Sequence, residues 1–217
     1  ASYPAAAVHG MLNLYSCLCR VSLKLPFSQM IFGRPKLWSI LLYYVILSAG
    51  AVWLLQKKQK KVCYLVFVFM AIFFLKRTEP KAFSVTFLDV GQGDGIVLRD
   101  DTGVTMLCDG GSSSVSNVGK YRILPYLRYH GIDRLDYVFL SHMDMDHING
   151  VRELLERQTC SIKIKNLVLP AIKNPDETYL EIERLAAGQK IAVHKMREGD
   201  CICTRSMMLT CLAPKAG

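Results

Sequence analysis

Nineteen consecutive residues, Leu37 to Leu55, contain no charged side chain. As a helix they would be roughly 28 Å long, close to the thickness of the hydrocarbon core of a lipid bilayer. Trp38 and Trp53 lie near the two ends of the stretch, where aromatic residues gather at membrane interfaces. The stretch therefore predicts a transmembrane helix, because a helix in the core of a soluble protein is rarely so uniformly apolar.

A second apolar stretch, Val62 to Leu75, follows a loop with four lysines at 56–61. Its length corresponds to roughly 21 Å of helix, so it would have to thin the bilayer, let flanking lysines reach the interface, or re-enter on the same side. We interpret it as a short second span. Upstream, Met11 to Leu25 predicts a helix ending at Pro26, either amphipathic or packed on other helices.

Charge is divided unevenly along the chain. Residues 1–81 contain eleven Lys and Arg against one acidic residue, whereas residues 82–217 contain sixteen against seventeen. The net charge of +9 therefore belongs to the apolar first third and does not indicate a nucleic-acid-binding face on the remainder. We divide the chain into an upstream membrane or amphipathic region (1–36), two transmembrane segments (37–55 and 62–75), a linker (76–82) and a soluble domain (83–217).

The soluble domain predicts a layered α/β arrangement in which strands alternate with helices. Strands are expected at 83–88, 94–99, 104–108, 137–140, 162–169, 190–196 and 207–212, and helices at 125–130, 147–157 and 176–187. The first two strands should form a hairpin across Gly91 and Gly93. Gly91 and Gly93 do not predict a nucleotide-binding loop, because no helix pattern follows them and no Lys-Ser/Thr pair is present.

Four potential metal ligands follow the strand that ends at Leu140: His142, Asp144, Asp146 and His147. Imidazole nitrogen and carboxylate oxygen are the donors that divalent cations take in such sites. Asp146 is expected to be the N-cap of the following helix, which would begin at His147. The alternative is a solvated acidic turn with two incidental histidines, but this run has almost no other residues between its four donors.

This His-x-Asp-x-Asp-His run resembles the His-x-His-x-Asp-His signature of the metallo-β-lactamase fold, with Asp144 where the signature has its second histidine. Together with Asp89–Asp94 and Asp109–Gly111, it resembles the hydrolase domain of the ComEC-type DNA-uptake proteins of competent bacteria. The resemblance implies an αββα sandwich. Residues 83–217 would hold the first half of that sandwich, and we expect the chain to be a fragment truncated at both ends.

The resemblance also implies a function for each site residue. His142 and Asp144 would serve one metal ion and Asp146 with His147 a second, with Asp146 as the catalytic group and Asp94 and Asp109 supporting the ligands from behind. The ions would be zinc or manganese, and the oxygen donor of Asp144 favours manganese. A pair of metals can stabilise both the attacking and the leaving oxygen of a phosphodiester, which is nuclease chemistry.

The substrate implied is single-stranded DNA, and the partners implied are membrane lipid and other proteins of the competence machinery, with no nucleotide cofactor. The protein would be a multi-pass bacterial membrane protein with its hydrolase domain outside the cytoplasm. Because further ligands are expected in a second half, this chain by itself is expected to be inactive. Two alternatives are another metallo-β-lactamase-fold hydrolase, acting on a thioester, lactone or RNA, and a non-catalytic membrane scaffold.

Other candidate ligands are interpreted as structural. The eight cysteines lack the paired spacing of a zinc ribbon and do not form a disulfide framework. His130 precedes a helix stop, and His194 alternates within a predicted strand. Neither histidine has the spacing of a ligand.

Overall fold

The computed structural model describes residues 2–25, 28, 30–57, 61–75, 82–156 and 162–214. The chain divides into two compact units, Ala1–Ile31 and Phe32–Gly217. The first unit holds helix α1 (Ser2–Leu23), which begins earlier than the expected Met11 because the alanine-rich start is also helical. Several expected features lie outside the described residues wholly or in part: the linker at 76–82, the lysine-rich loop, Pro26 and Arg157.

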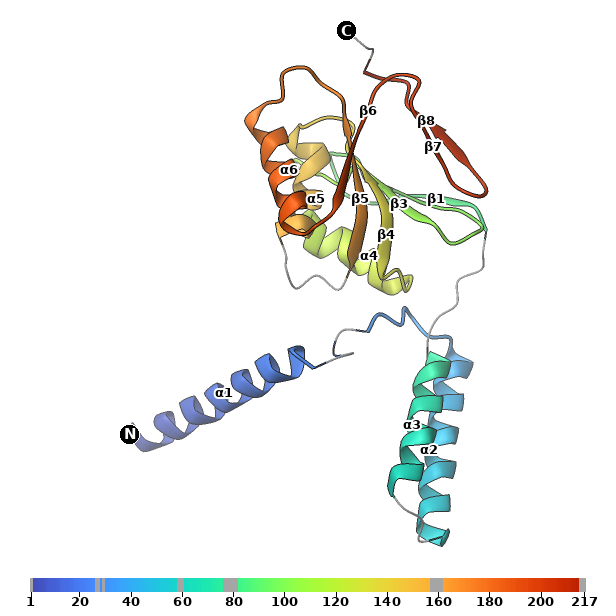
Figure 1. The fold of residues 1–217 in the computed structure, drawn as a ribbon. Helices are drawn as coiled ribbons and strands as arrows, with labels where there is room; N and C mark the ends of the chain where they lie inside the picture. The colour runs from blue at the N-terminus through green and yellow to red at the C-terminus, as the bar shows by residue number, and fades with distance from the viewer. Residues whose placement is uncertain are drawn as a thin grey trace. The chain divides into compact units, whose positions relative to one another are not determined.

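Helices α2 (Leu37–Lys57) and α3 (Lys61–Leu75) lie side by side in the second unit (Figure 1). Gly50 allows the close approach, since a Cβ at this position would lie 2.8 Å from Cγ of Phe67. The ring of Phe67 also lies 5.8 Å from that of Trp53. By length and composition, α2 could cross a membrane over Leu37–Gln56, and only 11% of its most apolar window is buried, unlike a core helix.

The second unit also contains a six-stranded mixed sheet in the order β1-β2-β3-β4-β5-β6. The pairs β1–β2 and β2–β3 are antiparallel, and the pairs from β3 to β6 are parallel. The expected hairpin of the first two strands is confirmed. The strands are β1 (Ser84–Phe87), β2 (Ile96–Arg99), β3 (Thr105–Cys108), β4 (Arg134–Phe139), β5 (Lys163–Pro170) and β6 (Ala192–Met196).

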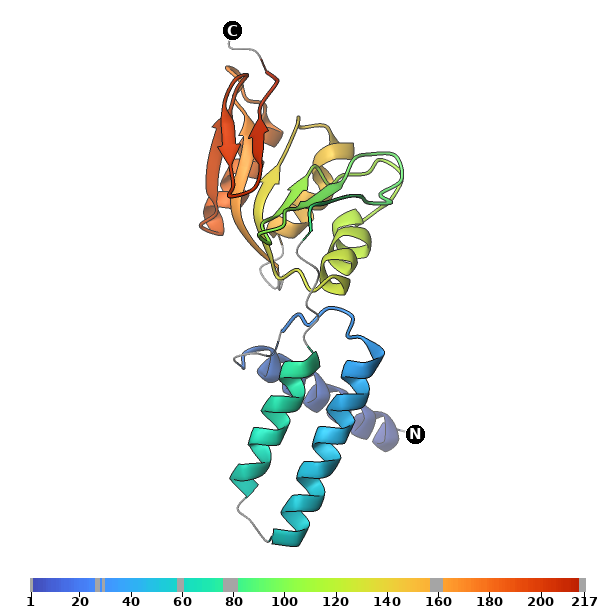
Figure 2. The same cartoon turned by 90° about the vertical axis from the view of Figure 1, so that its right-hand side faces the viewer.

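Helices cover one face of this sheet (Figures 1 and 2). They are the π-helical turn η1 (Gly119–Ile123), α4 (Leu124–Tyr129), α5 (Met145–Glu156) and α6 (Glu177–Gly188). Asp176, the first residue of the helix expected over 176–187, caps α6 by accepting a hydrogen bond from the Tyr179 amide at 2.8 Å. The core beneath the helices contains Leu107, Val138, Leu167, Ile148 and Ile182, all with no exposed surface.

A separate hairpin, β7 (Cys201–Cys203) with β8 (Met208–Thr210), lies on the other side of the sheet (Figure 1). The strand expected over 207–212 is confirmed as β8, whereas its partner β7 is not among the expected strands, because the three residues Cys201 to Cys203 are too few to show a strand pattern. Asp100, between β2 and β3, accepts hydrogen bonds from the hydroxyls of Thr204 and Ser206 at 3.1 and 2.9 Å. These bonds hold the hairpin loop against the β2–β3 turn.

Candidate metal centre

The donor motif lies at the carboxyl end of β4, where parallel strands of open sheets deliver their loops to functional sites. The helix that follows begins at Met145 and not at His147, so the expected N-cap role of Asp146 is wrong. The reason is that the Asp144 carbonyl accepts hydrogen bonds from the amides of His147 and Ile148, at 2.9 and 3.2 Å. Asp146 therefore lies in the first turn, where its negative charge interacts favourably with the helix dipole.

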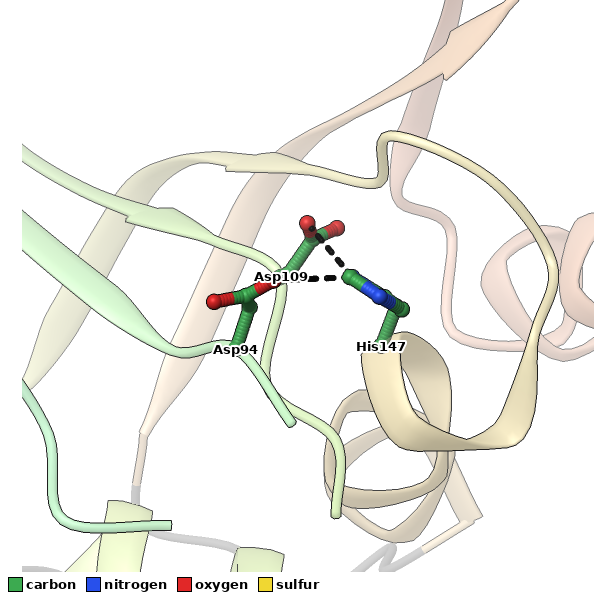
Figure 3. A group of neighbouring side chains, drawn as sticks. All are labelled: Asp94, Asp109 and His147. Carbon is green, nitrogen blue, oxygen red and sulfur yellow. Dashed lines mark hydrogen bonds and ion pairs between the residues drawn. The ribbon is translucent and has the colours of Figure 1, made fainter. Parts of the chain in front are cut away.

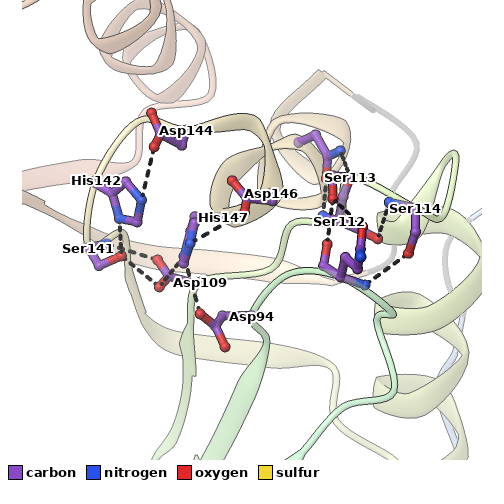
Figure 4. Close-up of polar contacts among 12 residues, drawn as sticks. Asp94, Asp109, Ser112, Ser113, Ser114, Ser141, His142, Asp144, Asp146 and His147 are labelled. Atoms are coloured by element: carbon purple, nitrogen blue, oxygen red, sulfur yellow. Dashed lines mark hydrogen bonds and ion pairs between the residues drawn. The ribbon is translucent and has the colours of Figure 1, made fainter.

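The four residues of the motif lie close together (Figure 4). The rings of His142 and His147 have centroids 3.9 Å apart. His142 Nε2 lies 3.4 Å from Asp144 Oδ2, and His147 Nε2 lies 3.9 Å from Asp146 Oδ2. His147 is largely buried, whereas the side chains of His142, Asp144 and Asp146 are open to solvent by 47%, 77% and 41% and so accessible to a substrate.

Two aspartates from other loops reach the same histidine (Figure 3). His147 Nδ1 lies 3.1 Å from Asp109 Oδ2 and 3.6 Å from Asp94 Oδ2. Among the described residues, Asp94, Asp109 and His147 form a group whose potential ligand atoms all lie within 4.8 Å of one another. The resemblance implies only a supporting role for these aspartates, and the structure brings both within contact distance of His147.

Glycines allow three loops to meet at this point. A Cβ on Gly93 would overlap the backbone of Gly111 and Asp146, and a Cβ on Gly111 would overlap the backbone of Asp146 and His147. Backbone hydrogen bonds join the same segments, from the Asp94 amide to the Asp146 carbonyl at 3.2 Å and from the Gly111 amide to the Asp94 carbonyl at 3.0 Å. The backbone thus fixes Asp94 and Asp109 relative to α5 without relying on side chains.

A polar clamp beside the aspartates holds the two loops together (Figure 4). Asn149 of α5 accepts from the Ser112 amide at 3.0 Å and donates to the Ser112 carbonyl. The backbone amide of Gln92 donates to the Ser114 hydroxyl at 2.8 Å, and the backbone carbonyl of Gln92 accepts from the Ser113 amide at 2.7 Å. The sequence does not predict these contacts, and the only signal for the residues is that they adjoin the two glycine motifs.

Asp109 occupies the centre of the arrangement. Its φ of 54° lies in the left-handed region, which Asp tolerates better than most residues. Its amide donates to the Phe139 carbonyl at 2.8 Å, and its carboxylate accepts from the amide and the hydroxyl of Ser141 at 2.8 and 2.7 Å. With 9% of its surface exposed, Asp109 is held on all sides by the ends of β3 and β4.

The charge of this group fits a cation. Asp94, Asp109, Asp144 and Asp146 approach histidines, and in the described part of the chain none of them forms an ion pair with Lys or Arg. Carboxylates gathered without a counter-charge repel one another, and a bound divalent ion removes that repulsion. Two imidazoles and four carboxylates suit zinc or manganese. The residues present therefore form a candidate site for a divalent metal ion.

His130 and His194 lie outside this group. His130 packs on Tyr126, with ring centroids 4.4 Å apart, at the amino end of β4. The length of β4 places that end roughly 20 Å from the motif. His194 Nε2 lies 3.0 Å from Asn166 Oδ1 on the neighbouring strand β5. The positions of both agree with the structural roles that the sequence predicts.

An apolar cavity of about 240 Å³ adjoins the site on the hairpin side of the sheet. Asp109 and Ser141 form one wall, and the remainder is lined mainly by apolar side chains such as Phe139, Val168 and Leu209. Cys108 also lines the cavity, where burial, with the neighbouring Asp109 charge adding to it, raises the pKa of its thiol to about 11. Cys108 is therefore protonated at neutral pH, and a protonated thiol is a poor nucleophile.

Comparison with known proteins agrees with this geometry. Residues 88–195 match the Metallo-beta-lactamase superfamily, a range that includes Asp94, Asp109 and the whole donor motif. ComE operon protein 3 of Bacillus subtilis (strain 168) is 28% identical over 148 residues, which cover 61% of this chain and 18% of that relative. The chain thus matches less than a fifth of the length of this relative.

Proposed function

We propose that this chain, which contains a metallo-β-lactamase domain of the ComEC type, is a membrane-anchored hydrolase that uses divalent metal ions to cleave single-stranded DNA. The observation that carries the proposal is the convergence of His142 and His147 with four aspartates at the carboxyl edge of the sheet. Superfamily members of this kind bind divalent metals such as zinc. The similarity to ComE operon protein 3 supports a role in DNA uptake.

The distances support a division of the motif between two ions. His142 with Asp144 would hold one ion, and His147 with Asp146 the other, since each histidine Nε2 lies nearest the carboxylate of its own pair. The bound ions would supply Lewis-acid stabilisation for the attacking and leaving oxygens of a phosphodiester. Asp146, exposed at the start of α5, would orient an attacking water and accept its proton.

The motif supplies four donors, whereas two catalytic ions use about six protein ligands. We therefore expect the 217-residue chain to bind metal but to be inactive on DNA by itself. Activity is best measured after exchanging the matched stretch of ComE operon protein 3 for the matching stretch of this chain.

In that chimera we expect cleavage of a labelled single-stranded oligonucleotide that needs added manganese or zinc. Cleavage should be lost with Asp146→Ala and kept with Asp101→Ala, a matched control in an exposed turn. Bound metal without cleavage would overturn the hydrolase assignment. Cleavage by the Asp146→Ala chimera would overturn the assigned role of Asp146.

Membrane anchoring is supported by α2, which is long enough to span, and by the shorter apolar helix over Tyr64–Leu75. We propose that both cross the membrane, with the hydrolase domain outside the cytoplasm. Cys201 and Cys203 are exposed on that domain and can be labelled to show on which side of the membrane it lies. With the other cysteines changed to serine, an impermeant maleimide should label both in intact cells; protection until lysis would reverse the orientation.

A further inference from the structure

Ser141 lies between the central aspartate and the exposed histidine of the motif (Figure 4). Its Oγ is 2.7 Å from Asp109 Oδ2 and 2.9 Å from His142 Nδ1, and its amide donates to Asp109 Oδ1 at 2.8 Å. Two hydrogen bonds to one carboxylate fix the serine, so its hydroxyl cannot turn away from the histidine. Ser141 thus connects Asp109, through a single oxygen, to His142.

The direction of each hydrogen bond follows by elimination. A carboxylate accepts and does not donate, so the single hydroxyl proton of Ser141 must point to Asp109. The Ser141 oxygen then has only lone pairs left for His142, and a contact of 2.9 Å requires a proton on Nδ1 of that ring. In the neutral ring of His142, Nε2 therefore carries the lone pair.

The tautomer of His147 follows from the same argument, because this ring contacts Asp109 directly and not through a serine. Its Nδ1 lies 3.1 Å from the same Asp109 Oδ2, so Nδ1 carries the proton and donates it to the carboxylate. The Nε2 atoms of both rings are left free, 3.4 Å from Asp144 Oδ2 for His142 and 3.9 Å from Asp146 Oδ2 for His147. Both lone pairs thus lie beside the carboxylates of the motif.

We propose that Ser141 is a positioning residue that relays the hydrogen bonding of Asp109 to His142, so that one carboxylate fixes the ring tautomer of both motif histidines. A histidine ligand binds metal through one nitrogen, and the hydrogen bond at the other nitrogen selects which one it is. The tautomers belong to the metal-free protein. Only the consequence for affinity rests on the proposed metal-binding function.

The tautomers can be read by ¹⁵N nuclear magnetic resonance of the metal-free 217-residue chain at pH 8, with the rings of its five histidines labelled. Both motif rings should be protonated at Nδ1. His194, whose Nε2 faces an Asn166 oxygen at 3.0 Å, should show the opposite tautomer and serves as an internal reference. A wild-type His142 ring protonated mainly at Nε2 would overturn the proposal.

Substitution separates the relay from general folding. Ser141→Ala should release His142 to the Nε2-protonated form while His147, which contacts Asp109 directly, keeps its tautomer. Ser141→Thr retains the hydroxyl, has room for its methyl because residue 141 is exposed, and should restore the wild-type spectrum. An unchanged His142 spectrum in Ser141→Ala would show that Ser141 does not determine the tautomer of His142.

Titration with Zn²⁺ or Mn²⁺ gives the second readout. Ser141→Ala should bind 10–100-fold more weakly, the usual loss when a ligand's supporting hydrogen bond is removed, and Ser141→Thr should bind as the wild type does. Equal affinity in all three would refute the relay's effect on binding. If the tautomers are as stated but the wild type binds no metal, the proposed function fails while the relay stands.

Discussion

Two buried aspartates flank strand β3, Asp100 in the turn before it and Asp109 directly after it, and they differ in the groups that donate hydrogen bonds to them. Asp100, 2% exposed, accepts from the amides of Thr102 and Val104 and from the hydroxyls of Thr102, Thr204 and Ser206. Asp109, 9% exposed, accepts from Ser141, and its remaining neighbour is the ring of His147.

Both carboxylates are buried, so burial alone does not distinguish a structural carboxylate from one at the candidate site. All five donors of Asp100 are amides and hydroxyls that join one turn to another, so this carboxylate acts only on the fold. The donors of Asp109 lead to two histidines whose free nitrogens lie beside other carboxylates. The identity of the partners marks the Asp109 end of β3 as the site.

The largest effect is expected from Gly111→Ala, which tests whether backbone contact holds the Asp109 end. The new Cβ would overlap the backbone of Asp146 and His147, which cannot rotate away. We expect a loss of about 3 kcal/mol or more in the free energy of unfolding, together with loss of metal binding. Gly188→Ala, with open space around its Cβ, is the control and should be neutral or slightly stabilising.

Asp100→Ala tests whether Asp100 stabilises the fold without affecting metal binding. It leaves five donors without their acceptor, and hydrogen bonds to a charged group contribute about 1.5–3 kcal/mol each before compensation by water. We expect a net loss of about 3 kcal/mol in urea unfolding, with unchanged metal affinity per folded molecule. A fall in metal affinity would mean that the two aspartates are not functionally distinct.

Asp109→Asn should show the reverse pattern. The asparagine NH2 group would face the Ser141 hydroxyl or the His147 Nδ1–H, which are themselves donors. The hydrogen bonds that keep both rings protonated at Nδ1 would then be lost. We expect metal affinity to fall 10–100-fold with a change in stability below about 1 kcal/mol. Calorimetric titration and thermal unfolding of the same samples measure both quantities, and a large stability loss without a loss of affinity would contradict the assignment.

The pH dependence of stability should reflect Asp100. Burial alone would raise the pKa of this carboxyl, but hydrogen bonds from Thr102, Val104, Ser206 and Thr204 outweigh it and lower the pKa from 3.8 to about 2. Because the folded-state pKa is the lower one, its contribution of about 2 kcal/mol is present above pH 4 and is lost as pH falls through 2. Asp100→Asn should remove this part of the acid dependence, measured by urea unfolding from pH 5 to 2.

Local patterns predict much of the fold. The alternation before Leu88 and the glycines after it predict the β1–β2 hairpin, and Asp176 marks the start of α6. The β7 strand was missed because three residues, Cys201 to Cys203, are too few to show a period. The helix start at Met145 was missed because a backbone carbonyl, and not the Asp146 side chain, begins the helix.

The candidate site is predictable only where its residues are adjacent in the chain. The run from His142 to His147 identifies itself by composition, and the resemblance adds Asp94 and Asp109. Their contact with His147 depends on loops that meet through Gly93 and Gly111, a long-range fit that no local pattern encodes. The relay through Ser141 requires atomic distances, because a serine before a histidine is otherwise unremarkable in sequence.

The most direct test of the metal centre is equilibrium dialysis of the 217-residue chain against Mn²⁺ and Zn²⁺, followed by measurement of bound metal per folded protein. The wild type and Asp101→Ala should each retain at least one ion, whereas His147→Ala, which removes the ring shared by Asp94 and Asp109, should retain less than a tenth as much. His147→Ala that stays folded and holds as much metal as the wild type would contradict the central claim.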